Sequence, residues 1–294
     1  MSTLDGYILP PLPSSMAEVL EIVAYGDPGN SMKRLVRVAE SDPALSAYVL
    51  RRVNSPFYGL SRHVESVEKA VHLLGGKTVC EVALEAGLKQ SFPFMETATG
   101  QNIYNLIVST SIASGKLTKT LASELRLPHS NMAFLVGLLH QIGRMVLLQT
   151  KETSYAALWY RLSDDVSTEE EPEFSPPELF SEKREIGITH IQAGTHVASH
   201  WHLPDLVETC IRHQARPEDA TPRPAQLMVY VVRVASLWSY APVLETPVDQ
   251  DTSGAFFSAL EGLATLRKQT ADDLVSMLRV AHEDAHSYAQ EHVA

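Results

Sequence analysis

Residues 134–148 read FLVGLLHQIGRMVLL, two apolar runs around a polar centre. The spacing of the apolar residues predicts a buried helix over about 130–149. An adjacent histidine and aspartate in such a helix would suit a divalent metal ion, because both side chains can ligate it. In this chain His140 is followed by Gln141, whose side chain carries no charge. The stretch is therefore compatible with a metal hydrolase, a relic of one, or an ordinary buried helix.

Helical periodicity continues on both sides of this stretch, and the strict alternation typical of strands is missing. Ser15 with Glu18 predicts a capping box for a helix that ends at Gly26. Asp42 followed by Pro43 predicts the start of the next helix. Further helices are expected at about 43–55, 66–75, 77–92, 102–125, 189–202, 204–213, 223–241 and 270–290. We therefore predict an all-α, multi-helix bundle.

The composition is that of an ordinary globular protein of 294 residues, with 45% hydrophobic and 20% charged residues. A change in composition near residues 92–100 predicts an N-terminal helical subdomain over 1–98 and a larger helical subdomain over 99–294. Residues 163–177, SDDVSTEEEPEFSPP, combine acidic residues with prolines. They predict an exposed connector that is open to proteases, or alternatively an acidic docking segment.

Charge and hydropathy restrict the partners that we expect. The net charge of −11 argues against unspecific binding to nucleic acid or to an anionic membrane surface. The N-terminus has no signal-peptide pattern, and no apolar run reaches the roughly 20 residues of a membrane span. Cys80 and Cys210 lie in apolar helical segments far apart in the sequence. We therefore expect buried, unpaired thiols and a cytoplasmic protein.

Few motifs of known chemistry occur. The chain has neither a glycine-rich phosphate loop nor the Gly-x-Ser-x-Gly motif of α/β-hydrolases. His196 and His200 share one helical face, but no glutamate follows His196, so an exposed polar face is favoured over a metal site. His140, His190 and His213 lie on three different predicted helices. They can act together only if the fold brings these helices to one place.

Four phrases in fixed order resemble the HDOD family, the HD-related output domain of bacterial signalling proteins. They are RVNSPFYG, SVEKAVHLLGGKTVCEVAL, FLVGLLHQIGRMVLL and EIGITHIQAGTHVASHWHLPDLVETCIRHQ. The similarity extends over roughly residues 10–240. It implies an N-terminal helical subdomain packed on a region related to the HD metal phosphohydrolases. It also implies a mostly non-catalytic, regulatory role, often in two-component or cyclic dinucleotide signalling.

Active HD proteins use an early histidine, an adjacent histidine–aspartate pair and a late aspartate. In this chain the early histidine falls at about Leu106, the pair on His140 and Gln141, and the late aspartate at about Ser236. His190 and His213 match two further histidine positions that are frequent in the family. The resemblance therefore implies a vestigial pocket formed by His140, Gln141, His190, His213, Leu106 and Ser236.

A buried divalent ion needs anionic ligands, and Gln141 offers only a neutral carbonyl oxygen. We therefore expect no catalysis, no metal and no cofactor, and a regulatory protein that binds other signalling proteins. One alternative is a metal-dependent phosphohydrolase of a nucleotide or cyclic dinucleotide, with Zn²⁺ held by three neutral imidazoles from His140, His190 and His213. Another is a ligand sensor that uses the vestigial pocket without turnover.

Overall fold

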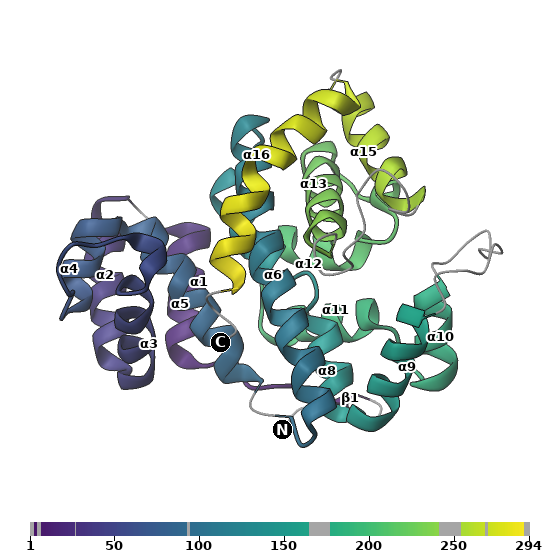
Figure 1. The fold of residues 1–294 in the computed structure, drawn as a ribbon, viewed down its shortest axis with the longest axis horizontal. Helices are drawn as coiled ribbons and strands as arrows, with labels where there is room; N and C mark the ends of the chain where they lie inside the picture. Colours follow the sequence, from purple (N-terminus) through teal and green to yellow (C-terminus); the bar gives the residue numbers. More distant parts are fainter. Residues whose placement is uncertain are drawn as a thin grey trace. The chain divides into compact units, whose positions relative to one another are not determined.

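The computed structural model describes residues 3–4, 7–26, 28–92, 95–164, 177–240, 254–267 and 270–290. These residues are almost entirely helical, which confirms the predicted all-α class (Figure 1). They form two compact units. The smaller unit consists of residues 11–93, and the larger unit consists of residues 1–10 together with residues 94–293.

The chain passes from the smaller to the larger unit at residues 93–94, where the sequence predicts a boundary after residue 98, and the first ten residues belong to the larger unit. The hydroxyl of Tyr7 donates to the carbonyl of Ile186 over 2.5 Å. The indole nitrogen of Trp201 donates to the carbonyl of Pro10 over 2.9 Å. Both bonds join residues that are far apart in the sequence, so hydrophobic periodicity gave no sign of them.

The smaller unit has five α-helices and one short 3-10 helix among its described residues. They are α1 (Ser14–Tyr25), α2 (Pro28–Ser41), α3 (Pro43–Val53), η1 (Pro56–Tyr58), α4 (Val67–Leu74) and α5 (Gly76–Ser91). Gly26 follows the end of α1, and Asp42 caps α3 by accepting from two backbone amides, both as predicted. The capping box predicted at Ser15 is wrong. Ser15 instead donates to the carboxylate of Asp42 over 2.7 Å, which ties the starts of α1 and α3 together.

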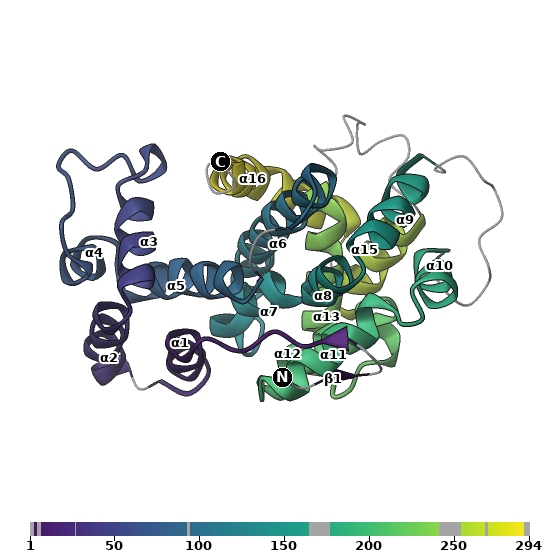
Figure 2. The ribbon, with the colours of Figure 1, turned by 90° about the horizontal axis from the view of Figure 1, so that it is seen from below.

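The larger unit is built around the long helix α6. Its described elements are β1 (Thr3–Leu4), β2 (Tyr7–Ile8), α6 (Ala98–Glu124), η2 (Ser130–Met132), α7 (Ala133–Leu139), α8 (Ile142–Thr150), α9 (Glu152–Asp164), α10 (Pro177–Glu185), α11 (His190–His200), α12 (Asp205–His213), η3 (Pro217–Asp219), α13 (Arg223–Tyr240), α15 (Gly254–Arg267) and α16 (Ala271–Gln290). Helix α6 packs against α7, α13 and α16, and Figure 2 shows it among its neighbours. Gly115 and Gly137 allow the close approach of α6 and α7, because a Cβ on Gly137 would lie 2.8 Å from the Cα of Gly115.

Some elements differ from the predictions. Helix α15 was not predicted, although its buried residues Leu260 and Leu263 have helical spacing. The two-residue strands β1 and β2 pair antiparallel and were not predicted either. The predicted connector is shorter than expected, since α9 extends to Asp164 and α10 begins at Pro177. The remainder, residues 165–176, lies outside the described residues.

The helix predicted over 130–149 is broken at His140 and Gln141, and its two parts are α7 and α8. Helix α8 packs on α11, and Gly143 makes this approach possible. A Cβ on Gly143 would lie 1.8 Å from the carbonyl oxygen of His190. The stretch 130–150 is long and apolar enough to cross a membrane, but 89% of its most apolar window is buried inside the protein. It forms part of the core of the larger unit.

Candidate functional site

His140 lies at the break between α7 and α8, and only 1% of its surface is exposed. Its Nδ1 lies 2.6 Å from the carbonyl oxygen of Gly137, and its Nε2 lies 2.8 Å from the hydroxyl of Ser236 on α13. Because a carbonyl can only accept, Nδ1 carries the ring proton and Nε2 accepts from Ser236. Burial lowers the pKa of His140 to about 3, so the ring is neutral at neutral pH.

Two glutamines flank this histidine. Gln141 is buried at the first position before α8. Gln214, which follows α12 and is also buried, donates through Nε2 to the carbonyl of His140 and to that of Ile211, both over 3.1 Å. The neighbouring His213 is only half-buried. The residue of this region that reaches His140 is therefore Gln214, one position beyond the predicted His213.

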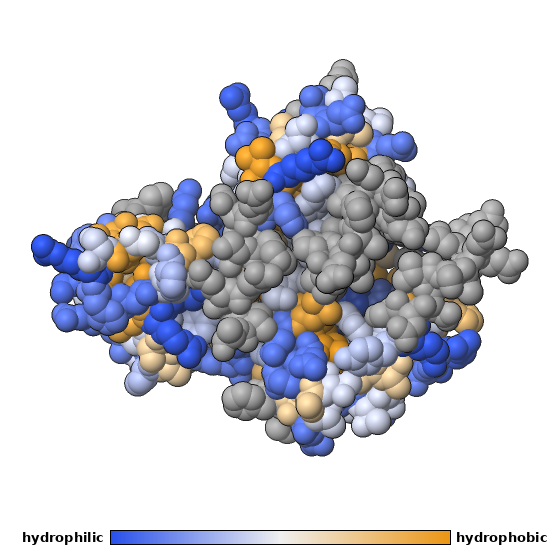
Figure 3. Space-filling view, in the orientation of Figure 1, coloured by the Kyte–Doolittle hydropathy of each residue, from blue (hydrophilic) through white to orange (hydrophobic). Residues whose placement is uncertain are grey.

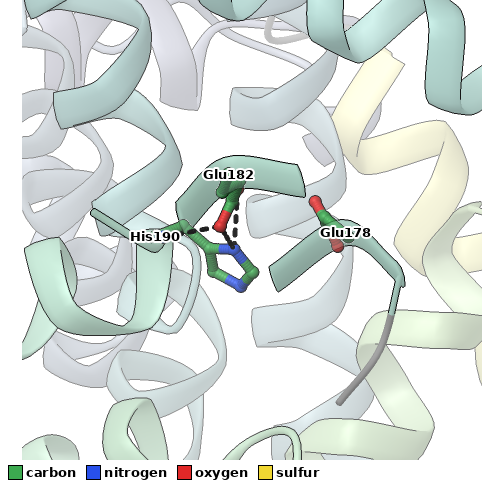
Figure 4. A group of neighbouring side chains, drawn as sticks. All are labelled: Glu178, Glu182 and His190. Atoms are coloured by element: carbon green, nitrogen blue, oxygen red, sulfur yellow. Dashed lines mark hydrogen bonds and ion pairs between the residues drawn. The ribbon is translucent and has the colours of Figure 1, made fainter. Parts of the chain in front are cut away.

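His190 begins α11 and is held by a glutamate of α10. The carboxylate of Glu182, which is fully buried, accepts from the backbone amide of His190 over 2.8 Å. Both of its oxygens also lie within 2.9 Å of Nδ1 of the ring, as Figure 4 shows. The hydroxyl of Tyr155 donates to the same carboxylate over 3.3 Å. Glu182 thus fixes both the start of α11 and the orientation of the imidazole.

A second carboxylate of α10 meets an arginine of α8. Both guanidinium nitrogens at the tip of Arg144 donate to the two oxygens of Glu178, with Nη2 2.8 Å from Oε2. Desolvation raises the pKa of Glu178, but the charges of Arg144, His190 and Arg233 outweigh it and lower the pKa to about 2. Burial and the charge of Arg144 lower the pKa of Arg233, against the attraction of Glu178. Arg144, His190 and Arg233 also lower the pKa of His140. The two arginines and two histidines therefore share one electrostatic site.

The other predicted candidates add little chemistry to this site. Leu106 is half-buried on α6, and its side chain has no atom that could bind a metal. Its carbonyl accepts from the hydroxyls of Ser109 and Thr110 in the same helix. His196 and His200 are both exposed on α11, in agreement with the polar face that their spacing favoured.

The sequence model of the HDOD domain matches residues 9–217 of this chain. The chain belongs to the HDOD family. HDOD domains are of signalling type, and the match covers the smaller unit and the part of the larger unit that carries His140, His190 and Gln214.

Solved structures share the fold of this HDOD protein. An HDOD domain protein of unknown function from Geobacter sulfurreducens is 18% identical, with a TM-score of 0.72 over 97% of this chain and 93% of that chain. A protein of Shewanella amazonensis SB2B, provisionally named a phosphohydrolase, is 21% identical, with a TM-score of 0.68 over 97% and 95% of the two chains. These identities establish the fold and no shared activity.

A sequence relative is longer than this HDOD protein. An uncharacterized protein of Treponema pallidum (strain Nichols) is 23% identical over 243 residues. The aligned part is 82% of this chain but only 44% of the relative, so the chain spans less than half of that protein's length.

One group in the HDOD protein has the spacing of a metal site. Glu178, Glu182 and His190 each offer a ligand atom, and these atoms lie within 4.8 Å of one another. Glu178 is paired with Arg144, and both oxygens of Glu182 lie against the amide and Nδ1 of His190. Of the three imidazoles of the phosphohydrolase alternative, His140 has both ring nitrogens within hydrogen-bond distance of protein groups, and His190 has Nδ1 against Glu182.

Sequence reasoning missed five residues of this site. They are Arg144, Glu178, Glu182, Gln214 and Arg233. Arg144 stood in the quoted stretch, and a cation four residues after a buried histidine in an apolar helix was a usable signal. Glu178 and Glu182 had no such signal in the sequence, because the placement of α10 brings them to the site and they belong to no recognisable motif.

Proposed function

We propose that this HDOD protein is a non-catalytic regulator of bacterial signal transduction that acts in the cytoplasm by binding other signalling proteins. The observation that carries the proposal is the state of His140. Both of its ring nitrogens are used in hydrogen bonds within the protein, and its neighbour Gln141 is uncharged. A metal ion at this position would have to displace the hydroxyl of Ser236 and would find no carboxylate on either of these two neighbours.

The cost of such an ion is physical. Removing a divalent cation from water is favourable only when anionic ligands replace its hydration shell. Gln141 and Ser236 occupy the positions where the resemblance places the two aspartates of active HD proteins. Neither side chain ionises at neutral pH. The positions of Gln141 and Ser236 therefore contribute none of the negative charge that a hydrolytic metal centre requires.

Exposed apolar residues of the smaller unit supply a surface for a partner. Tyr25, Leu73 and Met32 are 79%, 61% and 40% exposed. They lie on α1, α4 and α2, respectively, and α2 packs against both α1 and α4. Figure 3 shows hydrophobic atoms at the surface of this unit, at the left of the view. A contiguous exposed apolar patch is typical of a protein-binding surface, and our proposal is that these three side chains form part of one.

Metal content tests the non-catalytic part of the proposal. We expect elemental analysis of the purified protein to find no stoichiometric Zn, Mn or Fe, and we expect no hydrolysis of nucleotides or cyclic dinucleotides. A variant with Gln141→Asp and Ser236→Asp provides the comparison, because it restores two carboxylates beside His140. This variant should be stabilised by Mn²⁺ through mass action on the folded state. Stoichiometric metal together with turnover in the unmodified protein would favour the phosphohydrolase alternative.

Partner capture tests the binding part. Tagged protein is used to retrieve partners from the cells that express it, and the partners are identified by mass spectrometry. Leu73→Glu should reduce recovery of the partner, since it places a charge in the apolar surface. Val280→Glu is the matched control, because Val280 is also apolar and exposed but lies on α16 in the larger unit. Equal loss in both variants, or in neither, would contradict the assignment of this surface.

A further inference from the structure

We propose that residues 7–13 form a strap that couples the smaller unit to the His190 site, so that a partner bound to the smaller unit changes how firmly His190 is held. The strap begins in the larger unit, to which residues 1–10 belong, and it ends where α1 of the smaller unit begins. The strap itself is argued from contacts within the chain. Only the source of the signal, a partner on the smaller unit, rests on the proposed function.

The strap is bonded at both ends of α11, the helix that His190 begins. The hydroxyl of Tyr7 donates to the carbonyl of Ile186, in the turn before α11, over 2.5 Å. Trp201 follows the last residue of α11, and its indole nitrogen donates to the carbonyl of Pro10 over 2.9 Å. Tyr7 and Trp201 are both buried. A displacement of the strap therefore acts on α11 at its start and at its end.

The turn that Tyr7 contacts also determines the position of the imidazole. The backbone amides of Ile186 and Gly187 both donate to the carbonyl of Glu182, over 2.8 and 3.1 Å. The side-chain carboxylate of Glu182 in turn accepts from the amide of His190 and lies against its Nδ1. The end of α10, the turn and the imidazole are thus tied together, and Tyr7 holds the middle of this series.

The other end of the strap is fixed in the smaller unit. Helix α1 begins at Ser14, directly after the strap, and packs on α2 and α5. The hydroxyl of Ser15 donates to the carboxylate of Asp42, which also caps α3. Tyr25, which we assign to the partner surface, is the last residue of the same helix α1. A partner that shifts α1 therefore pulls on the strap.

Prolines make the strap stiff enough to transmit this pull. Pro10, Pro11 and Pro13 lie within four residues, and each proline ring fixes its own φ at about −65°. Pro13 has φ −59° and ψ 139°, which is the extended conformation of polyproline II. Proline-rich segments of this kind act as semi-rigid spacers. A shift of α1 therefore reaches the bonds at α11 and is not absorbed between the two units.

Hydrogen exchange of backbone amides, followed by NMR, tests the contact with the turn. Tyr7→Phe removes only the hydroxyl. We expect the amide of His190 to exchange roughly twofold to tenfold faster in this variant, relative to the amide of Val231 in the core of α13, because the turn opens more often. Tyr104→Phe is the matched control, since Tyr104 is also a buried tyrosine of the larger unit but lies on α6. It should leave the ratio of the two exchange rates unchanged.

Ser15→Ala tests transmission from the smaller unit, because it releases the start of α1 from α3. The ratio should rise here too. Ser46→Ala is the matched control, since the hydroxyl of Ser46 also bonds within the smaller unit, to the carbonyl of Ala39 over 2.7 Å, but lies on α3. Adding Pro11→Gly and Pro13→Gly to Ser15→Ala should return the ratio to that of the unmodified protein, because a flexible strap absorbs the shift.

Circular dichroism and thermal unfolding establish that each variant is folded. If Ser15→Ala does not fold, Ser15→Cys takes its place, because a thiol donates only weakly. Equal ratios in the Tyr7 and Tyr104 variants would overturn the inference, and so would equal ratios in the Ser15 and Ser46 variants. A ratio that stays raised after the two proline substitutions would also overturn it, since the shift would then reach α11 by another route. None of these variants changes the partner surface, so a failure of partner capture is distinguishable from a failure of the strap.

Discussion

At the scale of single residues, the hydrogen bond between Ser236 and His140 determines which chemistry the buried histidine can perform. The serine hydroxyl saturates the only lone pair that a neutral imidazole has available for a metal. His140 therefore acts as a link between the break after α7 and the helix α13. Its role is to fix packing, and removing its partner should have a cost in stability.

Ser236→Ala should lower the free energy of unfolding by about 1–3 kcal/mol, because Nε2 of His140 remains buried without a donor. Chemical denaturation with urea gives this value directly. Ser276→Ala is the control, since the hydroxyl of Ser276 is exposed and donates only to the carbonyl of Asp272 in its own helix. The control should change stability by less than about 0.5 kcal/mol. An equally small change for Ser236→Ala would mean that the bond contributes nothing to folding.

The pKa of His140 also predicts how stability depends on pH. The folded-state pKa of about 3 lies below the ordinary value of 6.5, so the unfolded chain takes up the proton first as the pH falls. The contribution of the neutral His140 ring to the free energy of unfolding is therefore complete above pH 6.5. It is lost between pH 6.5 and about 3, at about 1.4 kcal/mol per pH unit.

His140→Gln removes this titration while groups common to both proteins still titrate. The difference in unfolding free energy between the two proteins should shrink as the pH is lowered from about 7 to about 5. Urea unfolding at several pH values measures it. A difference that is independent of pH would show that His140 is not a buried neutral imidazole.

At the scale of secondary-structure elements, the contact between α8 and α11 places the site. The backbone of Gly143 lies directly against the start of α11, where His190 meets Glu182. The break between α7 and α8 lets α8 follow this direction while His140 stays in the core. A side chain at residue 143 would separate the two helices and so disturb both histidines.

Gly143→Ala should destabilise the protein by about 3 kcal/mol or more, because its Cβ meets backbone atoms that cannot rotate away. Thermal unfolding monitored by circular dichroism measures the effect. Gly76→Ala provides the comparison, since a Cβ there meets only the flexible side chain of Met32 at 3.1 Å. If both substitutions are equally mild, the close approach of α8 and α11 is not required for folding.

At the scale of the whole molecule, each of the two units carries one buried thiol. Cys80 lies on α5 in the smaller unit, and Cys210 lies on α12 in the larger unit. Desolvation, with a contribution from Glu81, raises the pKa of Cys80 to about 12, and desolvation alone raises the pKa of Cys210. Both thiols are therefore protonated and shielded in the folded protein, and each reports on the opening of its own unit.

Both cysteines should react with a thiol reagent at least about a thousandfold more slowly than an exposed thiol, because reaction requires the unit to open. The variants Cys80→Ala and Cys210→Ala isolate the two rates, which can be followed by absorbance. Both thiols should react rapidly in denaturant. Fast labelling of either cysteine under native conditions would contradict its burial in the core of that unit.

The sequence by itself was enough to predict the all-α class, most of the helices, the two buried thiols and the HDOD family. These features depend on local information: the 3.6-residue period of apolar positions, the capping of α3 by Asp42, and short phrases in a fixed order. The uncharged residue at Gln141 was equally visible, since it is a single letter in a recognisable stretch.

The tertiary structure alone decided which side chains share the site. The carboxylates of Glu178 and Glu182 on α10, which packs on α9, reach Arg144 of α8 and His190 of α11, and no spacing in the chain encodes that meeting. The break at His140 had the same origin. The local pattern favours one continuous helix, but the close backbone contact at Gly143 requires α8 to take its own direction. Long-range contacts of this kind depend on how whole elements pack, which a local pattern does not record.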